Sequence, residues 1–348
     1  MKLGHRLAML CLLGLAVSGA AARARAATSG EQLAQSAGRP LIGTQAPRLV
    51  LRTIDGDTID LGRLYGKQAV YLKFWATWCV PCRQQMPHFE HTYESAGPDL
   101  AVIAINTGFN DSIDEVRAYR RQLGIAMPIV IDDGKIGGAF GLRVTPQHIV
   151  IGRDGRILYV GHLADAHLDE ALAAARAMPA ADRSAAVKAA MSAPARQYGV
   201  GDRLPELSPR TLEGRRYAFL DPADPRRLVL VFLSPWCESY LATSRPAVSA
   251  NCRRMREQVS ELEGERAVRW LGIASGLWAT PEELREYRSK YGVAMPLALD
   301  ESGALFRAFK VTEVPVALIC DGNGRILRRI EGRDADTPAA LRAALNAP

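Results

Sequence analysis

An internal repeat restricts the possible folds of this chain more than any other feature of its sequence. Three segments recur in the same order in its two halves, and the first segment of each copy precedes a short predicted strand and an acidic-Gly turn. The matching segments, first copy before second, are residues 42–47 and 200–205, 123–128 and 291–296, and 140–146 and 309–315. Chance does not produce agreement at so many ordered points, so the chain contains two copies of one fold.

Both copies alternate strands with helices. A predicted buried strand, residues 69–75 or 228–233, ends at a Trp-Cys pair that opens a helix. There follow a second strand, a helix over residues 112–123 or 281–291 (the latter with Thr280 as N-cap), a strand pair and an Ala-rich helix. This βαβ unit followed by a ββα unit predicts an α/β fold in each half, with helices on both faces of a mixed central sheet.

The 348 residues are enough for two domains, each with its own core. We divide the chain into a signal peptide, an N-terminal linker, a first domain, a helical linker and a second domain. These five parts are residues 1–26, 27–41, 42–175, 176–199 and 200–348.

The N-terminus has the pattern of an export signal. The basic residues Lys2 and Arg6 precede an apolar stretch over residues 7–17. Residues 24–26 offer the small side chains that a signal peptidase reads, so we expect cleavage directly after them, with residues 20–22 as a competing site. The chain is therefore expected to be exported, and an uncleaved N-terminal membrane anchor is the alternative.

The charge of the chain does not indicate a nucleic-acid partner. The formal charge of +7 falls to +3 when the signal peptide is removed, because four basic residues and no acidic one leave with it. The remaining sequence contains no basic stripe interleaved with aromatic residues. No internal apolar run reaches the roughly 20 residues of a membrane span. We expect no nucleic acid as a partner.

Five cysteines remain in the mature chain, and in an oxidising compartment close pairs are expected to form disulfides. Cys79 and Cys82 stand three residues apart, directly after Trp78. At the start of a helix, unpaired backbone N–H groups and the helix dipole favour a thiolate at the first cysteine. We therefore predict a catalytic redox pair with Cys79 as the nucleophile and Cys82 as the resolving thiol, which exchanges through a mixed disulfide.

Four further side chains are expected to shape this site. Pro81 lacks the N–H that a first helical turn does not need, and it stiffens the loop. Trp78 provides an apolar wall beside the sulfurs. Pro146, which follows Thr145 and opens a strand, is a candidate for a cis peptide that faces the cysteines and presents backbone to an incoming peptide.

Residues 74–82 (FWATWCVPC) resemble the active-site signature of the TlpA/ResA-like branch of the thioredoxin superfamily. The resemblance covers residues 42–173 and, more weakly, residues 200–348, and it implies two tandem thioredoxin-like domains with a degenerate second copy. Such proteins are typically periplasmic or membrane-facing thiol reductases that serve cytochrome c or copper-oxidase assembly. The resemblance implies a reductase of protein disulfides with protein dithiols and disulfides as substrates, a membrane thiol electron donor and no cofactor.

Other uses of the cysteine pair have less support. A structural zinc site would need two more Cys or His at metal spacing, and no suitable residues follow Cys82. A purely structural disulfide to Cys79 would close too small a loop to add much stability. A Cu(I) site is chemically reasonable, but no Met/His cluster accompanies it. We expect no metal, and the alternative hypothesis is a metallochaperone-like or partner-binding module for copper or haem protein assembly without redox turnover.

The sequence does not identify the proton acceptor for Cys82. Lys73 stands where many thioredoxins have a buried acid, and the carboxylate that the ResA-like branch places soon after the central strand is missing. Lys73, Asp111 and Asp114 are candidates, although Lys73 is equally compatible with a solvated position on its strand. His148 is expected to lie on a sheet face rather than to act in catalysis.

The second copy has lost the dithiol, because Tyr240 stands where the resolving partner of Cys237 would be. One explanation is a degenerate scaffold that binds a partner or covers the first site. The other is a second disulfide with Cys252, which lies near an insertion. On one uninterrupted helix the two sulfurs would be roughly 22 Å apart, but Pro246 favours a bend that could bring them together. Cys320 is expected to be a small buried hydrophobe.

Overall fold

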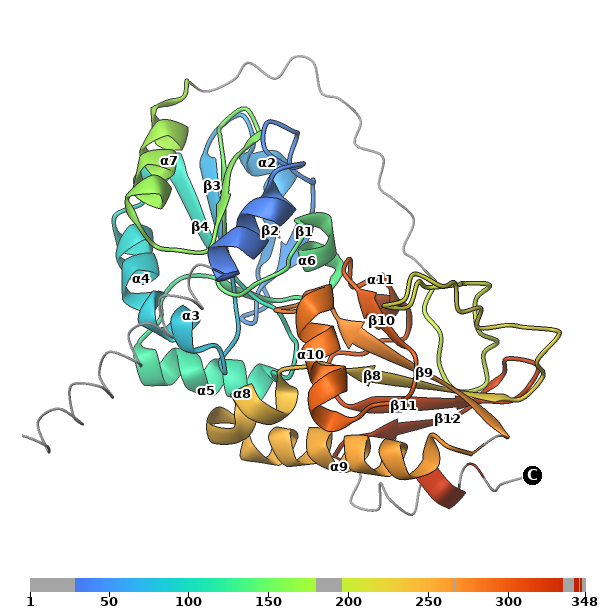
Figure 1. Cartoon of the computed structure of the whole chain (residues 1–348). Helices are drawn as coiled ribbons and strands as arrows, with labels where there is room; N and C mark the ends of the chain where they lie inside the picture. The colour runs from blue at the N-terminus through green and yellow to red at the C-terminus, as the bar shows by residue number, and fades with distance from the viewer. Residues whose placement is uncertain (1–28, 180–195, 266, 334–340, 344, 346–348) are drawn as a thin grey trace, which may run out of the picture.

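The computed structural model describes residues 29–179, 196–265, 267–333, 341–343 and 345 (Figure 1). The predicted signal peptide and most of the predicted helical linker lie outside the described residues. Residues 29–38, within the predicted N-terminal linker, form a helix, and its Ala34 is fully buried. In the described part of the chain, no helix is long and apolar enough to cross a membrane.

The first half folds around a five-stranded sheet in the order β5-β4-β3-β6-β7. β3, β4 and β5 run parallel, whereas β6 runs antiparallel to β3 and β7 antiparallel to β6. The five strands are β3 (Ala69–Trp75), β4 (Leu100–Asn106), β5 (Ile129–Ile131), β6 (Gln147–Ile151) and β7 (Ile157–Gly161). The other elements of this half are β1 (Val50–Arg52), β2 (Thr58–Asp60), α2 (Leu61–Leu64), α3 (Val80–Gln84), α4 (Met86–Glu94), η1 (Gly97–Asp99), α5 (Ile113–Leu123), α6 (Lys135–Ala139) and α7 (Ala166–Ala177).

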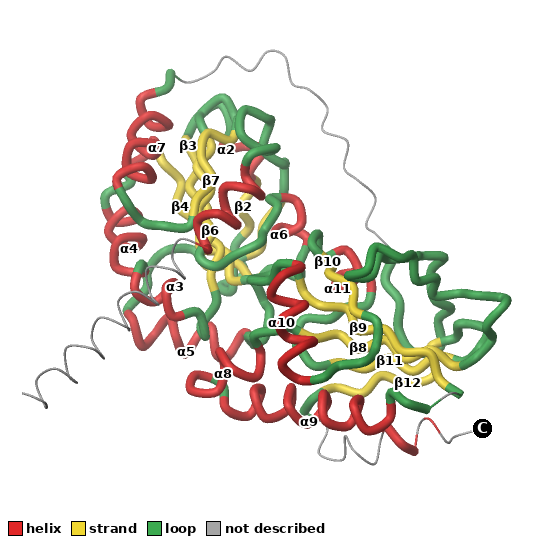
Figure 2. Tube along the Cα trace, in the orientation of Figure 1, coloured by secondary structure: helices red, strands yellow, loops and turns green. Residues whose placement is uncertain are grey.

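The second half has a sheet of the same topology, in the order β10-β9-β8-β11-β12. Its strands are β8 (Arg227–Leu233), β9 (Val268–Ser275), β10 (Leu297–Asp300), β11 (Val316–Cys320) and β12 (Ile326–Glu331). Its helices are α8 (Cys237–Ser244), α9 (Pro246–Leu262), α10 (Pro281–Tyr291) and α11 (Ala304–Ala308). Both sheets carry helices on their faces (Figure 2). The predicted fold class, two α/β domains with mixed central sheets, is confirmed.

Local sequence signals explain where the helices begin and end. Ser112 and Thr280 cap α5 and α10, and each forms a capping box with a glutamate three residues later. Both helices end at a glycine in the left-handed region, Gly124 and Gly292. The predicted N-cap at Thr280 is confirmed.

One predicted element of the second half is absent. The short strand expected before its acidic-Gly turn is not formed, although that segment is fully described. The backbone there makes only isolated bridges, from Arg210 to Arg216 and from Thr211 to Ala298. Single bridges do not extend into a ladder, so the segment stays irregular while its counterpart in the first half forms β1.

The central strand of the first sheet is buried along its whole length, from Ala69 to Trp75. Tyr71 and Trp75 face the apolar cluster that contains the cysteines, whereas Leu72 and Phe74 face a separate cluster on the other side of the sheet. The first cluster continues into the second half of the chain. The active-site side of the first domain is therefore where the two domains meet.

Candidate active site

Cys79 and Cys82 form a disulfide at the start of α3, with an S–S distance of 2.02 Å. Cys79 is the N-cap residue, and its Sγ lies 3.1 Å from the backbone nitrogen of Cys82. Pro81 occupies the first turn, where its missing N–H removes no helical hydrogen bond. The exposed fraction of Cys79 is 1% and that of Cys82 is 0%, so both sulfurs are shielded from solvent in this arrangement.

The Thr145–Pro146 peptide is cis, as predicted, and it faces the cysteines. Cys79 Sγ lies 3.3 Å from the carbonyl oxygen of Thr145. Trp78 closes another side, and its indole N–H donates to the carbonyl of Phe109 at 2.7 Å. The structure thus brings together the expected site residues from three separate segments of the first domain.

Lys73 is buried under this site. Its exposed fraction is 0%, its Nζ has no hydrogen-bond partner in the described part of the chain, and it lies 5.1 Å from the centre of the Phe89 ring. Burial lowers the pKa of Lys73 from 10.5 to about 7. The alternative that Lys73 is a solvated strand residue is therefore wrong, because β3 is covered on both faces.

The two carboxylate candidates for the proton acceptor have different surroundings. Asp111 is buried and accepts hydrogen bonds from the backbone and hydroxyl of Thr77 and from the amide of Asn106, at 2.5–2.8 Å. Burial raises the pKa of Asp111, and these hydrogen bonds oppose the rise. The side chain of Asp114 is 90% exposed, with Arg117 at 3.9 Å. Asp111 holds together the loop before α5, and Asp114 lies at the surface.

His148 is part of the sheet, as expected. It lies opposite Lys73 in the β3–β6 register. Its Nδ1 is 2.8 Å from the Tyr71 hydroxyl and its Nε2 is 2.8 Å from the amide oxygen of Gln85. Desolvation by burial lowers the pKa of His148 well below its usual value. The ring is therefore a neutral, doubly hydrogen-bonded member of the core.

The second domain covers the cysteine pair of the first. The ring of Trp236 lies 5.1 Å from that of Trp78, and Tyr240 packs edge-on against both indoles. The Tyr240 hydroxyl accepts a hydrogen bond from the backbone N–H of Val80 at 3.1 Å, between the two cysteines. The Trp-Cys segments of the two copies therefore face each other.

Two loops make reciprocal contacts across this interface. The backbone N–H of Trp278 donates to the carbonyl of Arg143, and that of Asn110 donates to the carbonyl of Thr312, both at 2.8 Å. Trp278 and Asn110 occupy matching positions before α10 and α5, and both have positive φ, 53° and 55°. Each domain thus places its loop before α5 or α10 next to the loop that precedes Pro315 or Pro146 of the other domain. The contact is equivalent in both directions, as in the isologous interface of a twofold dimer.

Trp278 also reaches the loop beside Cys79. Its indole N–H donates to the hydroxyl of Thr145 at 3.1 Å, and its ring packs edge-on against His162 with the centres 5.3 Å apart. This side chain occupies the surface next to Pro146, where a peptide was expected to bind.

Arg245 holds the other side of the interface. It lies between α8 and α9, and its guanidinium contacts Asp111 at 2.8 Å, Thr77 at 2.5 Å and the carboxylate of Glu115. Figure 2 shows the resulting contact region, where α5 and α8 lie side by side. The sequence analysis missed Arg245, because nothing in its local sequence indicates a partner about 130 residues away.

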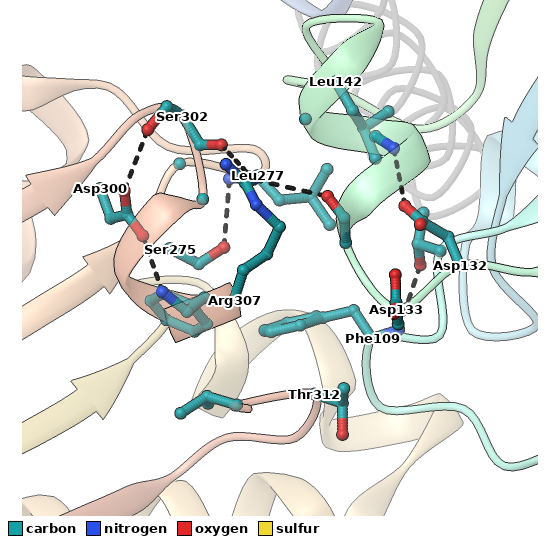
Figure 3. Close-up of a pocket in the computed structure, with 18 of the residues that line it drawn as sticks. Phe109, Asp132, Asp133, Leu142, Ser275, Leu277, Asp300, Ser302, Arg307 and Thr312 are labelled. Atoms are coloured by element: carbon teal, nitrogen blue, oxygen red, sulfur yellow. Dashed lines mark hydrogen bonds between the residues drawn. The ribbon is translucent and has the colours of Figure 1, made fainter. Parts of the chain in front are cut away.

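A cavity of about 300 Å³ lies between the domains and is lined by both (Figure 3). Asp132 and Asp300 hold equivalent places in it, and each accepts hydrogen bonds from the first backbone N–H groups of α6 or α11. Arg307 reaches across the cavity to the carbonyl of Gly134 at 3.4 Å. Burial raises the pKa of Asp132 to about 6. The cavity is a product of domain contact and does not include the cysteines.

The cysteines of the second domain also pair. Cys237 opens α8, Cys252 lies in the middle of α9, and the structure joins them in a disulfide. The chain turns at Arg245, directly before Pro246, which allows the two helices to pack together. Cys320 is free and buried, and burial raises its pKa to about 12. No group of three or more His, Cys, Asp or Glu in the described ranges could hold a metal ion.

Comparison with known proteins agrees with this geometry. Residues 42–160 match the model of the AhpC/TSA family. The thiol-disulfide oxidoreductase ResA of Halalkalibacterium halodurans is 38% identical over 120 residues, which are 34% of this chain and 66% of ResA, slightly less than two thirds of its length. The thioredoxin-like protein YneN of Bacillus subtilis is 35% identical over 133 residues, 37% of this chain and 78% of YneN.

Among solved structures, a thiol:disulfide interchange protein of the thioredoxin family from Chlorobium tepidum is similar to this chain. It is 26% identical, with 38% of this chain and 97% of that chain covered and a TM-score of 0.35. The sequence relatives carry the assignment: ResA of Bacillus anthracis is 34% identical over 119 residues, which are 34% of this chain and 67% of that protein, and YneN is matched over 78% of its length. The chain belongs to the ResA-like thiol-disulfide oxidoreductases of the thioredoxin superfamily.

Proposed function

We propose that this protein is an extracytoplasmic thiol-disulfide oxidoreductase that reduces protein disulfides through Cys79 and Cys82. The observation that supports this most directly is the position of the sulfur pair. Cys79 caps α3 and lies against the Thr145 carbonyl, so one sulfur is held next to the backbone on which a peptide would bind.

The reaction needs no group beyond the two cysteines and a proton acceptor. In the reduced protein, the Cys79 thiolate attacks one sulfur of a substrate disulfide, and the other substrate sulfur leaves as a thiolate that takes up a proton. Cys82 then loses its proton and attacks Cys79 Sγ, which breaks the mixed disulfide and releases the second substrate thiol. Two electrons pass to the substrate, and the protein ends with the Cys79–Cys82 disulfide. The N–H of Cys82 points at Cys79 Sγ, where it stabilises the thiolate.

The compartment and partners follow from the N-terminal sequence and from the family. A basic start, an apolar stretch and small residues at a cleavage position support export. We propose protein dithiols and disulfides as substrates, including proteins of cytochrome c or copper-oxidase assembly, and a membrane thiol protein as the electron donor. The relatives named ResA are thiol-disulfide oxidoreductases, which supports the chemistry but not the direction.

We also propose that the second domain covers the site in the resting protein and moves aside for a substrate. Its Trp236, Tyr240 and Trp278 lie where a substrate protein would contact the first domain. Both sulfurs of the first pair are almost fully buried, so a disulfide in another protein reaches Cys79 only after these contacts open.

The test is the reduction of a protein disulfide by the full chain, together with a redox titration of the Cys79–Cys82 couple. Cys79→Ser should abolish the activity, whereas Cys320→Ser, at a buried cysteine outside the site, should leave it unchanged. A midpoint close to that of thioredoxin, about −270 mV, supports a reductase. A much more oxidising couple would refute the proposed direction. If the unmodified chain is no more active than Cys79→Ser and binds Cu(I) stoichiometrically, with that binding lost in Cys82→Ser, the protein is instead a metal-binding module.

A further inference from the structure

Cys237 occupies the same backbone position in the second domain as Cys79 in the first. The backbone N–H of Cys237 donates to the carbonyl of Ser234 at 3.1 Å, and that of Cys79 donates to the carbonyl of Ala76 at 3.2 Å. Each is preceded by a tryptophan whose indole N–H donates to the loop after the neighbouring parallel strand. The helix that starts at Cys237, α8, directs its first backbone N–H groups toward this end.

In the second domain, the cysteine that pairs with Cys237 does not stand three residues after it. Tyr240 stands at the position of the resolving cysteine, and its hydroxyl is engaged with Val80 of the first domain. The sulfur comes instead from Cys252 on α9. Cys252 Sγ lies 3.8 Å from the carbonyl of Val314, the residue before Pro315. In the first domain, the sulfur in the corresponding place is Cys79, next to the carbonyl before Pro146.

The two sulfurs of this second pair differ in access. Cys252 is 8% exposed, whereas Cys237 is fully buried. A small cavity of about 20 Å³, which has room for about one water, borders Cys252 and Pro315. All of its lining residues lie between Val231 and Pro315, so none belongs to the first domain. The side of Cys252 that borders this cavity is therefore not covered by the first domain.

The cavity is lined mostly by apolar side chains, and polar groups also border it. The hydroxyl of Ser234 is buried in it without a hydrogen-bond partner in the described part of the chain. Arg256, one turn after Cys252 on α9, also lines it and pairs with Glu238 at 2.7 Å. The Ser234 hydroxyl can bind a water that carries a proton.

We propose that Cys237 and Cys252 form a second thiol-disulfide centre, in which Cys252 is the sulfur attacked by an incoming dithiol. This inference goes beyond the function proposed above, because the Cys79–Cys82 pair can complete its reaction without it. It assigns the second domain an exchange activity of its own, for which the substrate class is a small or protein dithiol.

The proposed exchange has two steps, in which bonds, electrons and protons are all accounted for. A thiolate of the donor dithiol attacks Cys252 Sγ, the Cys237–Cys252 bond breaks, and Cys237 leaves as a thiolate at the N-terminus of α8, where the helix dipole stabilises it. The second thiol of the donor then attacks the donor sulfur of the mixed disulfide and releases Cys252. The donor becomes a disulfide, and the two electrons and two protons that it gives up convert the pair to two thiols.

The first experiment uses the unmodified full chain. The protein is kept native with graded concentrations of dithiothreitol, the free thiols are alkylated, and peptides that contain Cys79 or Cys237 are quantified separately by mass spectrometry. We expect both disulfides to be reduced over a similar range of dithiol concentration. If the Cys237–Cys252 disulfide stays intact until the protein is denatured, under conditions that fully reduce Cys79–Cys82, it is a structural staple and the proposal is wrong.

The second experiment tests which cysteine of the pair forms a mixed disulfide more readily, in chains that carry Cys79→Ser and Cys82→Ser. Adding Cys237→Ser leaves Cys252 free, and adding Cys252→Ser leaves Cys237 free. With oxidised glutathione as the probe, we expect Cys252 to form the mixed disulfide about tenfold faster, since it is the more exposed of the two cysteines. Equal rates, or a faster reaction at Cys237, would overturn the assignment of Cys252. Loss of the first centre leaves this readout intact, so failure here is distinguishable from failure of the proposed reductase.

Discussion

At the scale of single residues, the least expected feature is the amine of Lys73 inside the core. A buried amine without a hydrogen-bond partner favours its neutral form, and the pKa of Lys73 falls to about 7. The unfolded chain keeps the usual value of 10.5. Between these two values the unfolded state holds a proton that the folded state lacks, so the free energy of unfolding rises with pH across this window. Below pH 7 both states are protonated and the penalty is largest.

Lys73→Met should therefore stabilise the protein. At pH 7 we expect the free energy of unfolding to increase on the order of a few kcal/mol, and its rise between pH 7 and 10 to flatten. Urea unfolding at several pH values measures both effects. Lys67→Met, at an exposed lysine, is the matched control and should change neither. A less stable Lys73→Met at pH 7 would mean that the folded protein stabilises the charged amine.

The site residues differ in how far their roles could be predicted from the sequence. Cys79, Cys82 and the cis peptide at Pro146 were predictable, because each belongs to a short motif whose chemistry is local. The burial of Lys73 was not, since it depends on both covered faces of the sheet. The role of Arg245 could not be predicted for a related reason, because its partners Asp111 and Glu115 come from the other domain.

At the scale of elements, the contact between the α8–α9 junction and the start of α5 depends on Arg245. Its partner Asp111 has a fully buried side chain, so this ion pair is better protected from solvent than a surface pair. Arg245→Ala should favour the open arrangement and speed alkylation of Cys79 in the reduced protein. We expect an increase on the order of tenfold, equivalent to about 1.4 kcal/mol.

Arg285→Ala is the control for this prediction, because Arg285 pairs locally, with Glu282 on α10. Its alkylation rate should equal that of the unmodified protein. An Arg245→Ala protein that folds normally but alkylates no faster would show that the ion pair does not hold the domains together.

The disulfide between α8 and α9 should also stabilise the second domain. It joins cysteines 15 residues apart, and closing such a loop is worth about 3 kcal/mol in the chain-entropy account. Replacing Cys237 and Cys252 with serine should lower the urea midpoint accordingly. The matched control is the double serine variant of Cys79 and Cys82, which are three residues apart and should cost less. A larger loss in the control would contradict this account.

The elements that could be predicted were those with a signal in their own local sequence. The capped helices and the break before Pro246 were evident from side-chain chemistry at single positions. The missing strand in the second copy was not, because a strand needs a partner, and the backbone around Thr211 finds only single bridges. The strand was predicted in the second half because the repeat aligns this segment with β1 of the first half, where strand pairing is complete.

At the scale of the whole molecule, the repeat predicted two sheets but not their arrangement. The two copies meet through the loops before α5 and α10, which show no hydrophobic periodicity. Asn110 and Trp278 contact the other domain through backbone N–H groups as well as side chains, and the backbone contacts depend on conformation rather than on side-chain pattern. This explains why the sequence left open whether the second domain covers the first site.

Trp278 and Arg245 contact the first domain at separate places, so the opening of the closed form can be tested from both. Trp278→Ala removes the hydrogen bond to Thr145 and the contact with His162, while it leaves Arg245 in place. We expect a larger radius of gyration in solution scattering and faster alkylation of Cys79 in the reduced protein. If both side chains act on one closed–open equilibrium, Trp278→Ala combined with Arg245→Ala should multiply the two single effects on that rate until the open form dominates. A double variant no faster than either single one, well below that limit, would mean that the two contacts do not control the same motion.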